Sequence, residues 1–584
     1  MSHDTSLVSG AMTHTHAHTP ADTHTVFNQS GALTGHNLYS GDRALRDALA
    51  FHAPGADEAP RAALGALLGS AAMQQHARLA NVHKPVLHTH DRVGQRSDRV
   101  EFHPSYHALL GAAVGAGLHA TPWALDPPGA HIERAAGFIL FTQLEAAVLC
   151  PVSMTYAVTP ALRGNPAVFG DWFPKLASTA YDPRLIPVQA KTGVTIGMGM
   201  TEKQGGSDLR ANTTRAAYEG DSAWGRCYRL TGHKWFFSAP MSDAFLVLAQ
   251  APGGLSCFFL PRVLPDGSEE GNEQGSMNAI AIQRLKDKLG NHANASAEVE
   301  FNGALAWLVG EEGRGIAQIL EMGTLTRLDC ALGTAGLMRG ATALALHHAV
   351  QRHAFGKALV DQPLMRNVLA DLALESEAAT ALALRLARAV DRQDDRFEAL
   401  MRRVLTPVAK FWVCKRGAAL AQEAMECLGG NGYVEAAGEC VMARIYREMP
   451  LNSIWEGAGN IMALDLLRAL RKRGGGGSDV VQALSAELAL TRGAHALLDC
   501  GTDTLLAQLT GPDAAVLDEV DARRLAQHVA LVMQASLLRR HAPDFVFDAF
   551  CRSRLDGANR AGLAFGTLPS SVAFDAILQR AMPA

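Results

Sequence analysis

The hydrophobic residues in the first third of the chain follow a helical pattern. Ala-rich apolar runs within residues 26–190 are broken by Gly and Pro, and one long run extends from Gly137 to Val148 and stops near Pro151. Apolar stretches of this length, without the strict alternation of a strand, are typical of buried helices, and proline tends to end them. The pattern predicts an N-terminal helical domain over residues 26–190.

The pattern changes near residue 190. Short runs of β-branched and aromatic residues, separated by Gly, Pro and Asp turns, continue to about residue 312. Many short strands at such spacing are typical of a small sandwich or barrel. We therefore predict a middle β-sandwich or barrel domain over residues 191–312.

Helical spacing returns in residues 313–473. One segment shows it at Leu364, Val368, Leu372, Leu382, Leu386 and Val390. Long amphipathic helices of this kind usually build a bundle. Four glycines and a serine at 474–478 have the composition of a flexible linker, and residues 478–584 are again helical in pattern. The predicted fold class is α+β, with a helical bundle at 313–473 and an additional C-terminal helical domain at 478–584.

The first 25 residues are rich in His and Thr. His14, His16 and His18 alternate and would lie on one side of an extended chain, where they could bind a metal. No cysteine or carboxylate cluster completes such a site. We therefore predict a disordered tail over residues 1–25 and no metal.

Composition narrows the class of protein. The chain has 584 residues, of which 48% are hydrophobic and 19% charged, which fits several globular domains. Nine scattered cysteines with no C-x-x-C pair indicate free thiols in a reducing compartment. No apolar run is long enough to span a bilayer, and the N-terminus lacks a signal-peptide pattern. We predict a cytoplasmic protein that does not enter the membrane.

The most informative chemistry lies at Glu456. This carboxylate stands just before a turn of small residues, Gly457, Ala458 and Gly459, and an apolar helical run follows at once. A carboxylate on a tight turn at a helix entrance is well suited to act as a general base, and the glycines let a flat ligand approach the backbone.

Four further segments have residues that suit a flat, phosphate-bearing ligand. They are Met198–Asp208, Gly232–Ser238, Arg352–Lys357 and Leu428–Tyr433. Backbone N–H groups at glycines and the fork of an arginine both bind phosphate, and hydroxyls and aromatics can line a ring system. Taken singly, a turn, a buried strand, a solvated arginine and a helix C-cap explain them equally well.

In this order, and with Glu456 at the end, the segments resemble the acyl-CoA dehydrogenases. The string from Met200 to Asp208 and the string from Asn452 to Gly457 are similar to the AidB branch of that family, the alkylation-response flavoproteins. The resemblance covers residues 24–475 well and the C-terminal region more loosely. It implies bound FAD, a homotetramer with flavin sites between subunits, and Glu456 as the base that removes a proton beside a thioester carbonyl.

The resemblance also assigns cofactor contacts. They are Met198, Thr201, Gly206, Ser207, Phe236, Phe237, Ser238, Arg352, Phe355, Gly429, Gly430, Ile454, Trp455 and Asn460. Three positions depart from the family pattern. Glu426 replaces a glutamine that contacts the cofactor in many members, so that contact is not assigned. Ala458 stands where the family has a hydroxyl, and Asn460 where it has glutamine, which keeps an amide.

The resemblance further implies that the C-terminal region binds double-stranded DNA. Residues 478–584 contain nine Arg, no Lys and twelve Asp plus Glu, within a chain of net charge −4. That balance is not the electrostatic footprint of a DNA-binding domain, and solvated helix ends explain each basic cluster equally well. A tetramer can nevertheless gather basic clusters on one face. The residues assigned to DNA are Arg471, Lys472, Arg473, Arg523, Arg524, Arg539 and Arg540.

We therefore predict an FAD-containing, acyl-CoA dehydrogenase-like protein of the adaptive response to DNA alkylation. It binds and protects double-stranded DNA and keeps weak dehydrogenase activity on an acyl-CoA-like molecule. One alternative is a catabolic acyl-CoA dehydrogenase without a DNA role. Another is a DNA-shielding protein in which FAD only stabilises the fold. The sequence does not identify the substrate.

Overall fold

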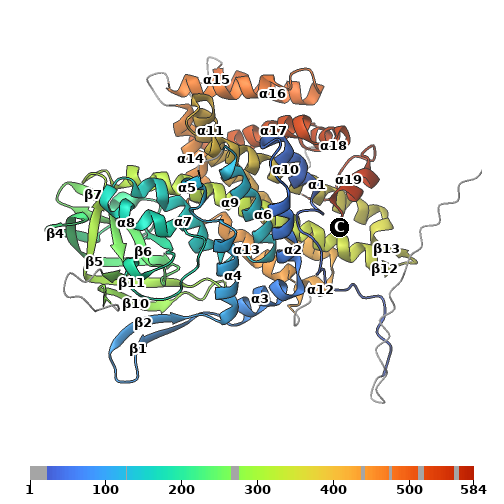
Figure 1. Ribbon diagram of the computed structural model, residues 1–584. Coiled ribbons are helices and arrows are strands. Elements are labelled where there is room, and N and C mark those ends of the chain that lie inside the picture. Colours follow the sequence, from blue (N-terminus) through green and yellow to red (C-terminus); the bar gives the residue numbers. More distant parts are fainter. Residues whose placement is uncertain are drawn as a thin grey trace, which may run out of the picture.

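The computed structural model describes residues 23–125, 128–264, 275–435, 441–471, 476–510, 518–557 and 564–583 (Figure 1). Within these ranges the chain runs through helices, then a β domain, then helices again. The predicted tail at 1–25 lies almost wholly outside the described residues. Among the described helices, none is both long and apolar enough to cross a membrane.

The N-terminal part is mainly helical, as predicted. Its helices are α1 Arg43–His52, α2 Ala59–Gly69, α3 Ala71–Val82, α4 Pro104–Gly115, α5 Pro122–Leu125, α6 Ala130–Leu144, α7 Leu149–Leu162 and α8 Pro166–Leu176. One feature was not predicted. Strands β1 (Val86–His90) and β2 (Arg96–Glu101) form an antiparallel hairpin that projects from the lower left of the molecule in Figure 1.

The middle domain is a seven-stranded sheet that curls on itself. Its strands are β3 Ile196–Gly199, β4 Arg215–Ser222, β5 Gly225–Ser238, β6 Ala244–Ala251, β7 Gly254–Pro261, β10 Ile280–Leu285 and β11 Ser296–Val309. The order is β10-β11-β5-β4-β6-β3, and β7 pairs with both β6 and β11, which closes a ring. Of the two predicted forms, sandwich or barrel, the domain is therefore a barrel, and Phe237, Phe245 and Phe258 fill its core. Short pieces flank it: η1 Val188–Ala190, η2 Leu209–Ala211, β8 Val263–Leu264 and β9 Ser276–Met277.

Long helices follow and form the predicted bundle. They are α9 Gly315–Gln351, α10 Pro363–Asp391, α11 Arg396–Cys427, α12 Gly430–Tyr433, α13 Met442–Asn452 and α14 Gly459–Leu470. A small hairpin of β12 (His353–Ala354) and β13 (Lys357–Ala358), followed by η3 (Leu359–Asp361), joins α9 to α10. In α10, Leu372, Leu382 and Leu386 are buried as their spacing predicts, whereas Leu364 at the start is exposed.

The C-terminal helices pack directly on this bundle. They are α15 Gly476–Ala489, α16 Ala496–Thr510, η5 Glu519–Asp521, α17 Ala522–His541, α18 Asp544–Arg554 and α19 Phe574–Ala581. Part of the glycine-rich segment predicted as a linker, residues 476–478, belongs to α15, and residues 474 and 475 lie outside the described residues. The apolar side chains of this region share one core with the bundle and the N-terminal helices.

Candidate active site

The backbone at Glu456 adopts a conformation that side-chain-bearing residues rarely adopt. Glu456 lies between α13 and α14 with φ +57°, and Gly457 follows with φ +99°. A side chain at Gly457 would be strained by this positive φ, and a Cβ there would also crowd the end of the flexible Met462 side chain at 2.7 Å, so glycine is favoured at this position. Residues other than glycine are held in this region only where their surroundings fix them, and such residues cluster at functional sites.

Two long helices hold the turn in place. Thr326 in α9 donates a 2.6 Å hydrogen bond from its hydroxyl to the Glu456 carboxylate, and Arg327 donates to the Glu456 carbonyl at 3.0 Å. Lys410 in α11 donates to the carbonyls of Trp455, at 2.8 Å, and Gly457. The carboxylate is partly buried and points along a fixed direction.

Burial raises the pKa of Glu456, although the Thr326 hydrogen bond and the charges of Arg327 and Lys410 act to lower it. A carboxylate whose pKa is shifted toward neutrality is a better general base near neutral pH than an ordinary glutamate. The position, backbone strain and pKa of Glu456 all suit proton removal from a bound ligand.

The segment after β3 forms a tight loop. Thr201 lies beside Gly206, where a Cβ would be only 2.4 Å from the Thr201 hydroxyl, so glycine is needed for the loop to close. The Trp235 N–H of β5 donates to the Thr201 carbonyl at 2.8 Å. Ser207 and the glycine backbone are open to solvent or only partly buried, as expected of a loop that cradles a ligand.

The end of β5 has two faces. A β-bulge sets Trp235 and Phe236 opposite the single residue Glu298, so Lys234 and Phe237 both point into the barrel. Phe236 is 51% exposed, whereas Phe237 is 0% exposed and packs on Phe245 with ring centroids 4.1 Å apart. Of the two β5 phenylalanines assigned to the cofactor, only Phe236 has its side chain on the open face, and Phe237 lies in the barrel core.

Polar residues that the sequence did not single out lie next to Ser238. The Ser238 and Ser296 hydroxyls are 3.2 Å apart. Lys288 donates to the Ser296 hydroxyl at 3.1 Å and to the Asn294 carbonyl at 2.6 Å. Burial lowers the pKa of Lys288 to about 8. These residues form a hydrogen-bonded polar group around Ser238 at the end of β5.

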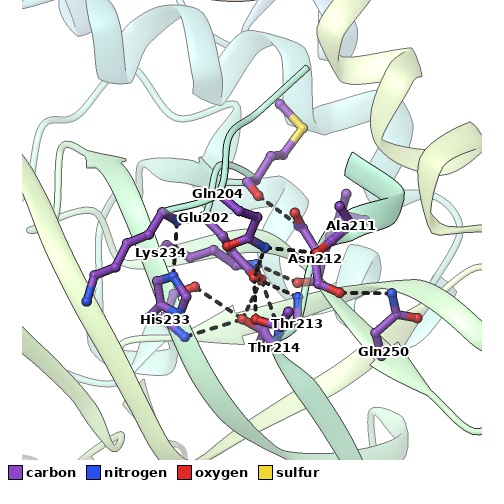
Figure 2. Close-up of polar contacts among 12 residues, drawn as sticks. Glu202, Gln204, Ala211, Asn212, Thr213, Thr214, His233, Lys234 and Gln250 are labelled. Atoms are coloured by element: carbon purple, nitrogen blue, oxygen red, sulfur yellow. Dashed lines mark hydrogen bonds and ion pairs between the residues drawn. The ribbon is translucent and has the colours of Figure 1, made fainter. Parts of the chain in front are cut away.

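Other missed residues lie beneath the Thr201 loop. Figure 2 shows Glu202 surrounded by Thr213, Thr214, His233 and Lys234. A signal was present in the sequence, because Lys234 is a lone charge beside a run of strand aromatics and Glu202 directly follows Thr201. For Thr326, Arg327 and Lys410, which hold Glu456, the sequence gives no such signal.

A second group of predicted residues lies elsewhere on the chain. Phe355 occupies the tip of the β12–β13 hairpin with φ +53° and is 99% exposed. The Arg352 guanidinium donates to the Asn28 carbonyl. The Asn28 side-chain amide accepts from the His353 N–H at 2.8 Å and donates to the His353 carbonyl at 2.9 Å. The N-terminal segment is thereby fastened to this hairpin.

The glycine-rich turn at Gly429 belongs to the same group. Gly429 has φ +60° and caps α12. Among the described residues, no atom beyond the immediate chain neighbours and the helix's own backbone lies within 4 Å of a Cβ built on Gly429 or Gly430, so both backbones are open to a ligand. Asn431 donates to the Gln29 side chain at 3.1 Å, which joins this turn to the Asn28 segment.

The two groups are far apart within one chain. Thr326, which holds Glu456, lies in the first half of α9, and Arg352 directly follows its end, so the two are separated by roughly 40 Å of helix at 1.5 Å per residue. The Glu456 turn and the Arg352 hairpin of a single chain therefore cannot contact the same cofactor.

The remaining assigned residues near Glu456 differ in their surroundings. Ile454 is 63% exposed. Trp455 donates from its indole to the Asn452 side chain at 3.1 Å. The Asn460 amide oxygen accepts from Arg523 of α17 at 3.4 Å, so the C-terminal region reaches the edge of the site.

The arginines assigned to DNA are not equally available. Arg540 pairs with buried Glu487 at 2.8 Å and lies over the Phe51 ring, whereas Arg539 and Arg524 are exposed and pair with nearby carboxylates. Arg471 and Arg468 line a hollow of about 260 Å³ beside Glu519. Lys472 and Arg473 lie outside the described residues.

The barrel, the bundle and the strained carboxylate held by helices α9 and α11 of the bundle define a protein of the acyl-CoA dehydrogenase class. Family models agree along the chain: the adaptive response protein AidB N-terminal domain matches residues 28–183, the acyl-CoA dehydrogenase middle domain 197–304, and the acyl-CoA dehydrogenase C-terminal domain 313–471. The chain is 48% identical to the putative acyl-CoA dehydrogenase AidB of Escherichia coli, over 91% of this chain and 95% of that protein. The chain belongs to the AidB family.

Solved structures share the whole architecture. Caenorhabditis elegans ACDH-11, solved in complex with C11-CoA, has a TM-score of 0.79 and 26% identity and covers 93% of this chain and 94% of its own. The apo form of Bd2924 has a TM-score of 0.78 and 28% identity and covers 89% and 100%. More distant structures with this fold contain FAD or its reduced form.

Proposed function

We propose that this protein is an FAD-containing, acyl-CoA dehydrogenase-like flavoprotein of the response to DNA alkylation, which binds double-stranded DNA and keeps weak dehydrogenase activity. The observation that carries the enzymatic part is Glu456, a partly buried carboxylate of raised pKa held on a strained turn. The DNA part rests on the family, whose N-terminal model carries the name of the adaptive response.

The residues present fit FAD. The loop at Thr201 closes only because Gly206 lacks a Cβ, and Phe236 and Ser238 form an open face beside it. Bound FAD supplies the two-electron acceptor. Thr201, Ser207, Phe236 and Ser238 would hold its ring system, and Glu456 removes the proton next to a thioester carbonyl. Ala458 offers no hydroxyl to the cofactor, which is consistent with weak activity.

A second function has support of its own. ACDH-11 was solved with C11-CoA, and the E. coli relative bears the name of an acyl-CoA dehydrogenase. The alternative is therefore a catabolic acyl-CoA dehydrogenase that oxidises an acyl thioester without a DNA role. The two proposals share Glu456 and FAD and differ only in whether the protein binds duplex DNA and how fast acyl-CoAs reduce the flavin.

The assembly belongs to the same proposal. Because Arg352 and Phe355 lie roughly 40 Å from the Glu456 turn of their own chain, they can serve a flavin only in a neighbouring copy. A homotetramer with shared flavin sites fits this geometry. We place the protein in the cytoplasm, with which both DNA and the free thiols of the eight described cysteines are compatible.

The DNA role is tested by titrating the yellow protein with a short duplex at two salt concentrations. We expect affinity to fall steeply with salt, because phosphate contacts release counterions. The variant R468Q/R471Q removes two exposed arginines that have no carboxylate partner among the described residues. We expect its salt slope to drop by about 2, roughly one per lost phosphate contact.

The matched control is R92Q/R99Q, which removes two exposed arginines on and beside the β1–β2 hairpin. It changes the net charge equally and should leave the slope nearly unchanged. A yellow wild-type protein indifferent to duplex at both salt concentrations rules out the DNA role. It favours the catabolic alternative, which a panel of acyl-CoAs then tests by flavin bleaching.

A further inference from the structure

Glu202 is a buried carboxylate that the proposed chemistry does not use. It follows Thr201 in the loop after β3 and has 0% exposure. Its two oxygens accept six hydrogen bonds, from the Thr213 N–H and hydroxyl, the Thr214 N–H and hydroxyl, Gln204 and Lys234, at 2.6 to 3.1 Å. Figure 2 shows these bonds converging on the carboxylate from three segments of chain.

Lys234 is the charged partner of Glu202. Its ammonium is 2.8 Å from the Glu202 carboxylate, and both side chains are 0% exposed. It also donates to the Leu248 carbonyl of β6 at 2.8 Å. Burial lowers the pKa of Lys234, and the Glu202 carboxylate opposes that shift. Burial acts to raise the pKa of Glu202, but Lys234 and the Thr213 and Thr214 hydrogen bonds outweigh it and lower the pKa.

A buried ion pair is not the cheapest way to stabilise a fold. Apolar side chains of similar volume often serve as well or better, because two charges must leave water. A pair with all its hydrogen bonds satisfied does, however, fix the relative position of the segments that carry it. The question is therefore which segments this pair fixes.

The two partners belong to two segments proposed to hold FAD. Glu202 is part of the Thr201–Gly206 loop, and Lys234 directly precedes the bulge that exposes Phe236. The backbones meet at the same place, where the Trp235 N–H donates to the Thr201 carbonyl at 2.8 Å. The Lys203 N–H also donates to the His233 ring at 3.1 Å. The pair thus joins the loop to the end of β5.

We propose that Glu202 and Lys234 are positioning residues that set the Thr201 loop against the Phe236 strand and so fix the FAD site. This inference rests on the proposed FAD role. The pair touches neither cofactor nor substrate and acts through the backbone of Thr201 and Trp235. Loosening it should release FAD and change the environment of the flavin ring before it unfolds the barrel.

The test uses the FAD-loaded protein and the variant Glu202→Gln. FAD dissociation is followed by the rise of flavin fluorescence, the ring environment by visible circular dichroism, and the fold by far-ultraviolet circular dichroism. We expect FAD to dissociate about tenfold faster, the equivalent of one lost hydrogen bond to a charged group. The visible dichroism should change as well.

The matched control is Asp243→Asn. Asp243 forms a 2.8 Å ion pair with buried Lys191 in the same domain and accepts from the Thr195 N–H, at the opposite end of β3 from the Thr201 loop. Loss of the Asp243–Lys191 ion pair should lower the unfolding temperature, as Glu202→Gln does, but should leave FAD release and the visible dichroism unchanged. Equal FAD release in the two variants overturns the proposal.

The double variant E202Q/K234M covers the case in which Glu202→Gln folds poorly, because it leaves no unpaired buried charge. We expect it to regain stability but to keep fast FAD release and the altered spectrum. If E202Q/K234M retains FAD as well as the wild type does, the positioning role is overturned, but the proposed FAD-binding function is not. A wild-type protein that binds no FAD overturns the proposed function itself.

Discussion

Glu456 combines three constraints that rarely occur together. Its backbone is left-handed, its carboxylate accepts from Thr326, and the carbonyls on both sides of it are held by Lys410. Each constraint costs something in the free chain, and the packed helices α9 and α11 compensate. A carboxylate fixed in this way cannot turn aside when a ligand binds, which is what proton abstraction at a defined carbon requires.

Replacement of Glu456 by Gln should remove the base and keep the shape. We expect turnover of any acyl-CoA that reduces the flavin to fall by about 10²- to 10⁴-fold. Wild-type kcat/KM should rise with pH through the pKa of Glu456, above the ordinary glutamate range, because only the carboxylate accepts a proton. Stopped-flow measurements of flavin bleaching across pH give both the turnover of Glu456→Gln and the pH dependence of the wild type. Full turnover in Glu456→Gln would show that another group is the base.

The variant Thr326→Val serves as a control that shifts the pKa of Glu456 but keeps its carboxylate. The hydrogen bond from Thr326 stabilises the carboxylate form and so lowers the pKa of Glu456. In Thr326→Val the pKa should rise further, and the ascending limb of the pH profile should move to higher pH. The base itself is kept, so the plateau at alkaline pH should still be reached. If the ascending limb of the pH profile does not move, it reports the titration of a group other than Glu456.

Helix α10 holds the C-terminal helices through buried charges. Arg385 pairs with Glu487 of α15 at 2.9 Å, Glu375 with Arg554 of α18 at 3.1 Å, and Glu377 with Arg580 of α19 at 2.8 Å. Each pair is desolvated, so loss of one partner would leave an unpaired buried charge. The C-terminal region is therefore fixed to the bundle as closely as any core helix.

One contact in this region is sensitive to acid. His52 of α1 and His541 of α17 have ring centroids 6.2 Å apart, and none of their ring nitrogens has a hydrogen-bond partner within the described part of the chain. Burial lowers the pKa of His541 to about 4, with Arg580 and Arg540 also lowering it and Asp47 opposing. Burial lowers the pKa of His52 as well, helped by His541, Arg385, Arg388 and Arg540.

These shifts predict loosening of α17 in mild acid. The folded pKa of His541 lies below the unfolded value of 6.5, so the unfolded chain binds more protons and stability falls as pH drops from about 6.5 towards 4. At pH 5 the free energy of unfolding should be about 2 kcal/mol lower than at neutral pH. Limited proteolysis at pH 7 and pH 5 should show it, and His541→Leu should reduce it. Equal acid sensitivity in that variant would contradict the assignment.

Periodicity predicted the barrel and the long helices because each buries a regular apolar face. It did not predict the β1–β2 hairpin, whose strands carry His and Arg residues and bury few of them. The resemblance to the acyl-CoA dehydrogenases, and not periodicity, assigned both Phe236 and Phe237 to the cofactor, although Phe237 lies in the barrel core. The bulge at Trp235 and Phe236 shifts the alternation by one residue, and no local residue pattern announces it.

The same limit applies to contacts between distant segments. The Glu456 motif was visible in sequence, but its partners Thr326 and Lys410 come from helices more than 40 residues away along the chain. The basic pairs at the C-terminus were equally visible. That Arg540 faces buried Glu487, whereas Arg524 faces solvent, depends on how α17 packs. Patterns along one helix do not contain that information.

On the scale of the whole molecule, residues assigned to the cofactor lie in two separate regions along α9. Thr326, in the first half of α9, holds Glu456, whereas the Arg352 hairpin and the Gly429 turn, joined by the Asn28 segment, lie at the C-terminal end of α9. A fully exposed phenylalanine on a rigid two-residue turn is unfavourable in a lone chain and typical of an anchor at an interface. Under the proposed function, self-association that brings these two regions of neighbouring copies together would complete the FAD site.

Phe355→Ser should therefore weaken assembly and cofactor retention together. Aromatic anchors of this kind contribute on the order of 2 kcal/mol or more to an interface, so the tetramer should dissociate at concentrations at least about tenfold higher than in the wild type. Sedimentation velocity monitored at the flavin band measures both quantities in one experiment. Val520→Ser, at an exposed apolar residue of η5 with 87% exposure, is the control and should change neither assembly nor FAD retention.

Two results would contradict this prediction. If Phe355→Ser stays tetrameric and fully yellow, or if the wild type retains FAD as a monomer, the Glu456 turn of one copy and the Arg352 hairpin of another do not share a site. If assembly weakens while each subunit keeps its FAD, Phe355 is an interface residue alone, and the cofactor is held entirely by the Thr201 loop and the Glu456 turn of its own chain.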